Sequence, residues 1–75
     1  MTFDKRVVSL RFRQLRGKRT QREVAAGIGV SSNLYAMYER GERMPKDKDK
    51  PKIAEYFGLS IEDLFYSDEA IHTGG

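Results

Sequence analysis

Two helix-start signals separated by a short glycine turn constrain this 75-residue chain more than any other feature. Thr20 and Glu23 have the spacing of a capping box, in which each side chain accepts a hydrogen bond from the other residue's backbone N–H. Gly29 suits the positive φ of a sharp turn after a helix, and Ser31 is a good N-cap for the next helix. Gly41 again suits the left-handed position at a helix end. The sequence therefore predicts two consecutive helices joined by a tight turn.

The residues before this pair predict a further helix. Val8, Phe12 and Leu15 fall at i, i+4 and i+7, which places them on one stripe of a helix. This helix covers Lys5–Arg16 and ends at Gly17. The arginines that lie mostly off the stripe are expected to face solvent or a ligand, and they are Arg11, Arg13 and Arg16.

The second half of the chain predicts two more short helices after a charged connection. Residues 42–50 alternate in charge and contain Pro45, which favours a solvated loop. Pro51 suits the first turn of a fourth helix, because its missing N–H costs nothing there, and Gly58 ends that helix. Ser60 resembles the N-cap of a fifth helix.

Length and composition support one small domain built from these helices. Seventy-five residues allow a single compact unit, and the absence of cysteine removes disulfides and thiolate metal sites. We expect an all-α fold, a compact bundle of five short helices over residues 1–66, with a flexible tail over residues 67–75. No apolar run approaches the roughly 20 residues that span a bilayer, and residues 1–6 lack the apolar stretch of a signal peptide. We therefore expect a cytoplasmic protein.

The residue types give no support to catalysis. An enzyme would need a nucleophile beside a base, a carboxylate pair in a pocket or a metal cluster, and no such set falls on one expected face. His72 is the single histidine, with no cysteine in the chain, and we assign it no metal or catalytic role. We expect neither enzymatic activity nor a cofactor.

The charge distribution is asymmetric along the chain. All 14 lysines and arginines lie within residues 1–52, where 6 acidic residues leave a net charge of +8, whereas residues 53–75 carry 5 acidic residues and no basic one. A basic body with an acidic end suits a polyanionic partner such as nucleic acid on one face. A solvated, lysine-rich surface without such a partner is the alternative that charge alone leaves open.

Several short motifs lie along the chain with a characteristic spacing. They are Thr20-Gln21-Arg22-Glu23-Val24-Ala25, Gly29-Val30-Ser31, Tyr38-Glu39-Arg40-Gly41, Pro45 and Phe57-Gly58-Leu59-Ser60-Ile61-Glu62-Asp63-Leu64-Phe65. Together they resemble the Cro/phage-repressor-like helix-turn-helix family, also called the Xre family, over about residues 5–66. The resemblance implies a lambda-repressor-like DNA-binding domain. In that fold the second and third helices form the DNA-binding pair, and the third, about residues 31–40, lies in the major groove.

The resemblance also implies roles for individual residues. The positions that match the family's base-contacting residues are Ser32, Asn33, Leu34 and Met37. The positions that match its phosphate-contacting residues are Gln21, Arg22, Arg40 and Arg43. Arg16 and Glu39 resemble the family's interhelical ion pair. A strict count from Thr20 would place Gln14 where the family has its arginine, so the Arg16 assignment assumes a tightened turn.

Physical arguments bear on some of these roles. A helix N-terminus has free N–H groups and a dipole that favour an anion, which suits Gln21 as a phosphate contact. Asn33 could pair with adenine through two hydrogen bonds or satisfy a backbone N–H at the helix start, and a neighbouring serine already supplies the cap. Met37 lies away from the inward stripe of Tyr35 and Tyr38, so we expect it to face DNA.

The resemblance implies a sequence-specific DNA-binding transcriptional regulator, a repressor of bacterial or phage origin associated with the nucleoid. Its partner would be a double-stranded DNA operator, bound by a homodimer whose interface we expect to include Leu64, Phe65 and Tyr66. The same apolar stretch could instead cover the small core of the chain itself. An antitoxin-type module that binds a partner protein and uses DNA binding for autoregulation is the alternative. A toxin-sized neighbouring gene would favour it. The chain could also be the N-terminal part of a longer repressor.

Overall fold

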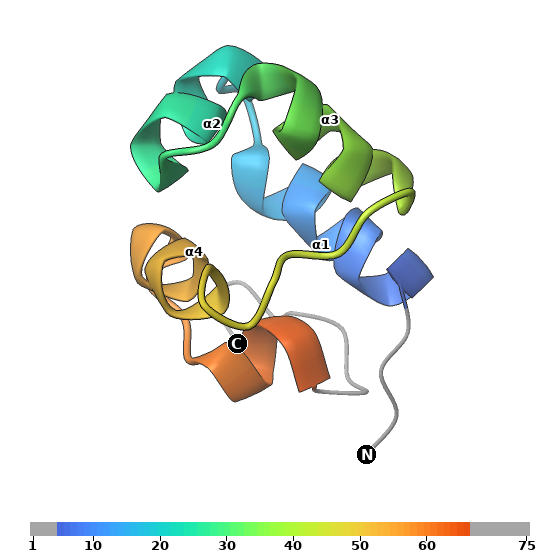
Figure 1. Ribbon diagram of the computed structural model, residues 1–75, viewed down its shortest axis with the longest axis vertical. Coiled ribbons are helices and arrows are strands. Elements are labelled where there is room, and N and C mark those ends of the chain that lie inside the picture. The colour runs from blue at the N-terminus through green and yellow to red at the C-terminus, as the bar shows by residue number, and fades with distance from the viewer. Residues whose placement is uncertain (1–4, 67–75) are drawn as a thin grey trace.

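A computed structural model describes residues 5–66 and folds them into five helical segments (Figure 1). These are α1 (Lys5–Arg16), α2 (Gln21–Ile28), α3 (Ser32–Arg40), α4 (Lys50–Phe57) and η1 (Glu62–Tyr66), the last a short π-helical turn. The described range contains no β-strand, so the predicted all-α bundle of five short helices is confirmed. The flexible tail predicted over residues 67–75 lies outside the described residues.

The α2–α3 pair begins and ends where its sequence signals lie. The Glu23 N–H donates to Thr20 Oγ1 at 3.0 Å and the Thr20 N–H donates to Glu23 Oε1 at 3.3 Å, so the capping box is formed. The turn after α2 depends on Gly29, whose φ of 93° lies in the left-handed region that favours glycine. Ser31 Oγ accepts a hydrogen bond from the Leu34 N–H at 3.0 Å and caps α3. These short-range bonds set where α3 begins.

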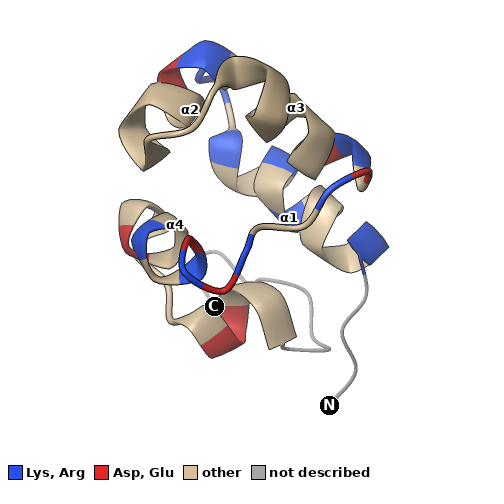
Figure 2. Cartoon of the chain, viewed as in Figure 1, with Lys and Arg blue, Asp and Glu red and all other residues tan. Residues whose placement is uncertain are grey.

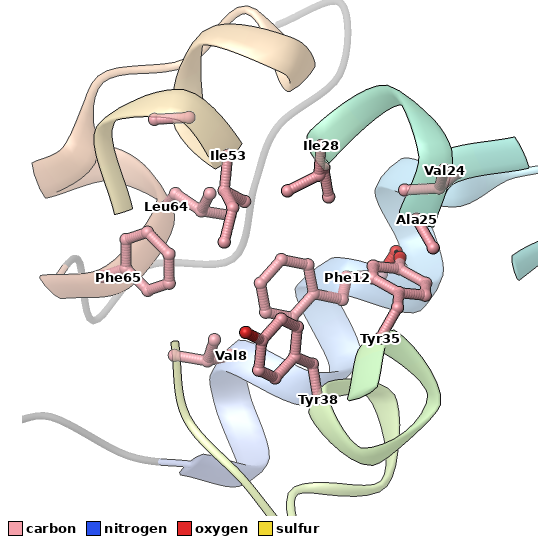
Figure 3. Close-up of a cluster of buried hydrophobic side chains, with 11 residues drawn as sticks. Val8, Phe12, Val24, Ala25, Ile28, Tyr35, Tyr38, Ile53, Leu64 and Phe65 are labelled. Atoms are coloured by element: carbon pink, nitrogen blue, oxygen red, sulfur yellow. The ribbon is translucent and has the colours of Figure 1, made fainter. Parts of the chain in front are cut away.

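Phe12 of α1 lies at the centre of the core (Figure 3). Its ring meets Tyr35 edge to face and stacks with Tyr38, in both cases with 5.8 Å between ring centroids, and it lies 6.1 Å from the ring of Phe65. Such aromatic pairs add to the stabilisation that burial provides. Tyr35 and Tyr38 are both buried, which confirms their predicted inward orientation. The inner face of α3 is therefore held against α1, and its opposite face points outward.

The connection from α3 to α4 is mostly exposed, in agreement with the solvated loop predicted for residues 42–50, but two residues of that range are buried. Pro45 is buried, and Lys50 is only 8% exposed. Lys50 Nζ donates to the Tyr66 hydroxyl at 2.6 Å and pairs with Asp47 at 3.1 Å. The alternating charges gave no indication that Lys50 is buried, because a lysine is buried only where other residues of the fold supply partners for its charge.

The η1 segment completes the core. Leu64 and Phe65 are 0% and 1% exposed, which corrects the expectation that they form an exposed apolar surface for a dimer. Arg11 of α1 is also buried, and its Nη1 donates to the Leu64 carbonyl oxygen at 3.0 Å. The expectation that Arg11 faces solvent or a ligand is wrong, because its guanidinium binds a backbone carbonyl inside the molecule.

Helix α4 packs against α2 at a glycine. A Cβ atom on Gly27 would overlap the ring of Tyr56, so glycine permits this close approach. The Arg19 guanidinium lies 5.3 Å from the centroid of the Tyr56 ring and donates to its hydroxyl at 3.0 Å. Arg19 Nη2 also donates to the Leu15 carbonyl oxygen at 2.6 Å. This one side chain thus closes the α1–α2 turn and ties it to α4.

Candidate nucleic-acid interface

The outward face of α3 carries no charged side chain over its first two turns (Figure 2). Ser32 and Asn33 are exposed, whereas Leu34 and Met37 are half-buried. Leu34 packs against the hydrophobic core. The four residues predicted to contact bases therefore lie within the first two turns of α3, and Leu34 contributes to both the surface and the core.

The Asn33 side chain makes no hydrogen bond to any residue in the described part of the chain. The sequence left open whether its amide would satisfy a backbone N–H at the helix start. Ser31 Oγ accepts from the Leu34 N–H and meets that need instead. The amide of Asn33 thus keeps its donor and acceptor groups, which are the two that a bidentate contact to adenine requires.

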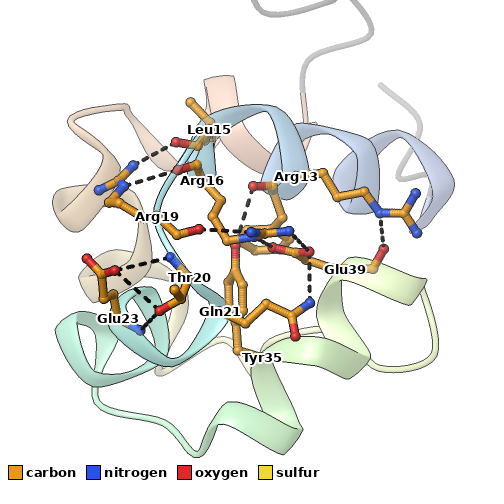
Figure 4. A network of polar contacts seen from close by, with 10 residues as sticks. Arg13, Leu15, Arg16, Arg19, Thr20, Gln21, Glu23, Tyr35 and Glu39 are labelled. Atoms are coloured by element: carbon orange, nitrogen blue, oxygen red, sulfur yellow. Dashed lines mark hydrogen bonds and ion pairs between the residues drawn. The ribbon is translucent and has the colours of Figure 1, made fainter.

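Glu39 links α1, α2 and α3 through one carboxylate (Figure 4). Arg16 donates to it twice, from Nε to Oε2 at 2.6 Å and from Nη2 to Oε1 at 3.1 Å. Gln21 Nε2 also donates to Oε1 at 3.1 Å. The ion pair expected between Arg16 and Glu39 is thus present, with the tight α1–α2 turn that it assumed. Gln21 keeps its second Nε2–H and its own amide oxygen, so Glu39 orients Gln21 without using all of its hydrogen-bonding groups.

The same partners hold Glu39 in its ionised form. Burial by itself would raise the pKa of the Glu39 carboxyl, but the hydrogen bonds from Arg16 and Gln21 favour its charged form, and the pKa lies below its ordinary value. The hydrogen bond to Glu39 in turn raises the pKa of Arg16. Arg13 Nε donates to the Glu39 carbonyl oxygen at 3.0 Å. This contact was not predicted from the sequence. The network positions three helices while keeping its negative charge neutralised and 3% exposed.

The first turn of α2 offers groups that suit a phosphate. Gln21 is half-buried and Arg22 is exposed. Within this turn, the Glu23 N–H donates to Thr20 Oγ1 and the Val24 N–H donates to the Thr20 carbonyl oxygen. The backbone N–H groups of Gln21 and Arg22 come before these two and have no partner within the helix. Free N–H groups and the helix dipole together favour an anion at this end. The phosphate contacts of Gln21 and Arg22 stay predictions that this placement supports.

Two arginines, one at the end of α3 and one just after it, differ in their contacts. Arg40 donates from Nε to Glu42 Oε2 at 2.7 Å and from Nη2 to Glu42 Oε1 at 3.1 Å. Arg43 is exposed and forms no ion pair or side-chain hydrogen bond with another residue of the described range. Of the two arginines predicted to contact phosphate here, one has an unengaged guanidinium and the other already binds a carboxylate.

A hollow of about 290 Å³ beside the start of α3 brings Arg43, which was predicted to contact phosphate, together with lysines that the sequence placed in a solvated loop or left without a role. Val30 and Leu34 contribute apolar lining, and Asp49 is its acidic residue. The cationic residues that line it are Arg43, Lys46, Lys48 and Lys52. Lys52 pairs with Asp49 at 3.3 Å, so the remaining three supply net positive charge next to α3. The alternating pattern of residues 42–50 does not indicate which lysines share a side with α3.

Metal-binding clusters and membrane-spanning helices are absent from residues 5–66. No group of three or more histidine, cysteine, aspartate or glutamate side chains in this range is placed to hold a metal ion. None of its helices has the length and apolar character needed to cross a bilayer. His72 lies outside the described residues.

Comparison with known proteins agrees with this architecture. A family model described as helix-turn-helix matches residues 11–64. The chain therefore belongs to the helix-turn-helix family, whose second motif helix enters the DNA major groove. It is 41% identical over 63 residues to the cryptic phage CTXphi transcriptional repressor RstR of Vibrio cholerae. The match covers 81% of this chain and 57% of that repressor, so the chain spans a little over half the length of this relative.

Two archaeal relatives and one solved structure extend the comparison. The chain is 41% identical over 51 residues to an uncharacterized HTH-type transcriptional regulator of Methanocaldococcus jannaschii, covering 67% of this chain and 77% of that one. It is 38% identical over 61 residues to another from Archaeoglobus fulgidus, with coverage of 79% and 86%. A solution structure of the SOS-response transcriptional repressor LexA from Eubacterium rectale superposes with a TM-score of 0.72 at 23% identity, covering 100% of this chain and 88% of that one. This last likeness concerns the fold alone.

Proposed function

We propose that this protein is a transcriptional repressor that binds a double-stranded DNA operator with α3 in the major groove. It acts by binding and not by catalysis, at the chromosome in the cytoplasm. The observation that carries the proposal is the arrangement around α3, where an exposed, uncharged first turn with Ser32 and Asn33 is flanked by basic groups. Uncharged hydrogen-bonding side chains suit base edges, and cations beside them suit the phosphates that border the groove.

The relatives support a role in regulation. Each of the three relatives compared by sequence is named as a transcriptional repressor or regulator. The Vibrio relative is named a repressor, and repression is therefore the direction of regulation that we propose.

In the proposed complex, one set of residues contacts bases and gives specificity, and another set contacts phosphates and gives affinity. Asn33 pairs with adenine, and the half-buried Leu34 and Met37 meet apolar groups such as a thymine methyl, beside Ser32. The phosphate contacts, which carry no sequence information, come from Gln21, Arg22, Arg40 and Arg43.

Two copies of the chain bind one operator in this proposal. One helix-turn-helix unit contacts a single half-site, and dimers of this class place their recognition helices about 34 Å apart, one turn of DNA. Leu64 and Phe65 belong to the core, so the interface uses what stays accessible of the C-terminal stretch, namely the half-buried Tyr66 and the exposed Ile61.

Selection of bound duplexes from a random library tests the proposal. The full chain should enrich an inverted repeat whose half-site centres lie about 10 base pairs apart. It should bind that duplex about 1,000-fold or more tightly than a shuffled duplex of the same length. Sedimentation of the complex should give two chains per duplex, and a single chain would contradict the dimer. If no sequence is enriched above the starting library, the repressor proposal fails.

A further inference from the structure

The chain turns sharply after α3, and the turn brings Glu42 back beside Arg40. Gly41 has a left-handed φ of 73°, and its N–H donates to the Tyr38 carbonyl oxygen at 3.2 Å. The Glu42 N–H donates to the Met37 carbonyl oxygen at 3.0 Å. These two bonds form a Schellman motif, the arrangement that closes many helix ends. The backbone therefore holds Glu42 next to Arg40 independently of any side-chain contact.

The Glu42 carboxylate engages Arg40 as a phosphate would. Two N–H groups of one guanidinium donate to the two carboxylate oxygens, which is the fork geometry that arginine also uses with phosphate oxygens. The hydrogen bond from Arg40 lowers the pKa of Glu42, so its carboxylate is ionised at neutral pH. The side chains of Arg40 and Glu42 are 49% and 54% exposed, so a phosphate can reach the guanidinium without any movement of α3.

We propose that Glu42 competes with DNA phosphate for Arg40 and thereby limits the affinity of the protein for DNA. This inference rests on the proposed function of α3 as the recognition helix. In the free protein the pair is internally neutral, and Arg40 must leave Glu42 before it can neutralise a phosphate. Glu42 therefore sets the strength of one phosphate contact without itself touching DNA.

Removal of the competitor should strengthen DNA binding. Exposed ion pairs of this kind contribute modestly, which corresponds to about a two- to fivefold gain in affinity for Glu42→Gln at low salt. The gain should appear with a mixed-sequence duplex as well as with a selected operator, because a phosphate contact does not depend on sequence. Glu55→Gln is the matched control, since Glu55 is an exposed glutamate on α4 and its replacement changes the net charge equally.

A double-mutant cycle with Arg40→Gln separates competition from simple repulsion between Glu42 and DNA. Affinities of the wild type, the two single variants and the double variant are measured by fluorescence anisotropy on one labelled mixed-sequence duplex. We expect the gain from Glu42→Gln to disappear in the Arg40→Gln background and to exceed that from Glu55→Gln in the wild type. Circular dichroism and thermal melting confirm that each variant is folded.

Three results overturn the inference. An equal gain in both backgrounds means that Glu42 repels DNA directly, and no gain in the wild type means that Arg40 is not limited by its partner. A gain no larger than that of Glu55→Gln means that net charge alone is responsible. Failure of the repressor proposal is distinguishable, because it would leave duplex binding without sequence preference while the cycle still reports on Arg40. Absence of any duplex binding at low salt contradicts both.

Discussion

The α2–α3 pair and the segment from residue 42 to η1 are held in place by different kinds of interaction. In the pair, each boundary has a short-range bond of its own: the capping box at Thr20, the hydroxyl cap at Ser31 and the left-handed turn at Gly41. Such bonds depend on residues within a few positions of one another. The part of the molecule that would face DNA is therefore specified largely by its local sequence.

The C-terminal segment relies on contacts made across the fold. Asp49, at the start of α4, makes no side-chain cap bond. Instead, Lys50 binds the Tyr66 hydroxyl 16 residues away, and Phe65 packs on Phe12 of α1. Local caps are also present, since Ser60 Oγ accepts from the Asp63 N–H at 3.0 Å and Gly58 ends α4 in the left-handed region, but the position of the segment against the core depends on the long-range contacts. The comparison predicts that removing a long-range contact destabilises the C-terminal segment strongly, whereas changing a cap or turn residue of the α2–α3 pair has a smaller effect.

The largest effect should follow from removing a long-range contact of the C-terminal segment. Phe65→Ala deletes a ring that is 1% exposed, and we expect the free energy of unfolding to fall by about 3–5 kcal/mol in urea titrations. Ile61→Ala is the control, because Ile61 is 36% exposed and should cost about 1 kcal/mol or less. Similar losses for the two variants would break the comparison, since η1 would then be a surface element.

Glu39→Gln should have an intermediate effect, because Glu39 connects the locally capped pair to α1. The substitution weakens charge-assisted hydrogen bonds from Arg16, and we expect a loss of about 1–3 kcal/mol in the free energy of unfolding. Urea titration measures the loss. A change within error would show that α3 is held by its apolar face alone.

The same variant makes a prediction about acid stability. The pKa of Glu39 is lower in the folded chain than its ordinary value of 4.5. Its contribution to stability is therefore present above about pH 4.5 and is lost as the pH falls through the lower, folded pKa. Thermal melts from pH 7 to pH 3 should fall more steeply for the wild type than for Glu39→Gln below about pH 4.5. Parallel curves would contradict this.

The smallest of these stability effects should come from the turn after α3. Gly41 has a φ of 73°, and a Cβ there would meet Ser9 only at ordinary contact distance, so Gly41→Ala is opposed by backbone strain alone. We expect a loss of about 1 kcal/mol in the free energy of unfolding, and a smaller loss for Gly41→Asn, since asparagine tolerates this region better. Equal losses would show that backbone conformation does not account for the glycine.

The sequence predicts the α2–α3 pair well because its signals are local. Thr20, Ser31 and Gly41 each specify a hydrogen-bond pattern that involves only neighbouring residues. The ion pair of Arg16 with Glu39 could not be derived in that way, because its partners are 23 residues apart, and the expectation came from family resemblance.

Buried charge is what sequence reasoning missed. Arg11 binds the Leu64 carbonyl 53 residues away, and Lys50 is covered by η1. The residues next to Arg11 and Lys50 in the sequence do not indicate that these side chains are buried. A charged side chain is buried only when distant groups supply its hydrogen bonds. The apolar side of Leu64 and Phe65 posed a similar problem. A hydrophobic stripe on a terminal helix can cover its own core or a partner, and the sequence alone does not distinguish the two.

The base preference of Asn33→Ala tests the central claim most directly, namely that the exposed start of α3 reads DNA. Binding to a panel of operator duplexes with single base-pair changes should show lost discrimination at one base pair, by about 1–3 kcal/mol, with the other positions unchanged. Arg43→Ala, measured beside it, should weaken every duplex about equally. If Asn33→Ala keeps the wild-type preference at every base pair, or weakens all duplexes equally as Arg43→Ala does, α3 does not read DNA as this account requires.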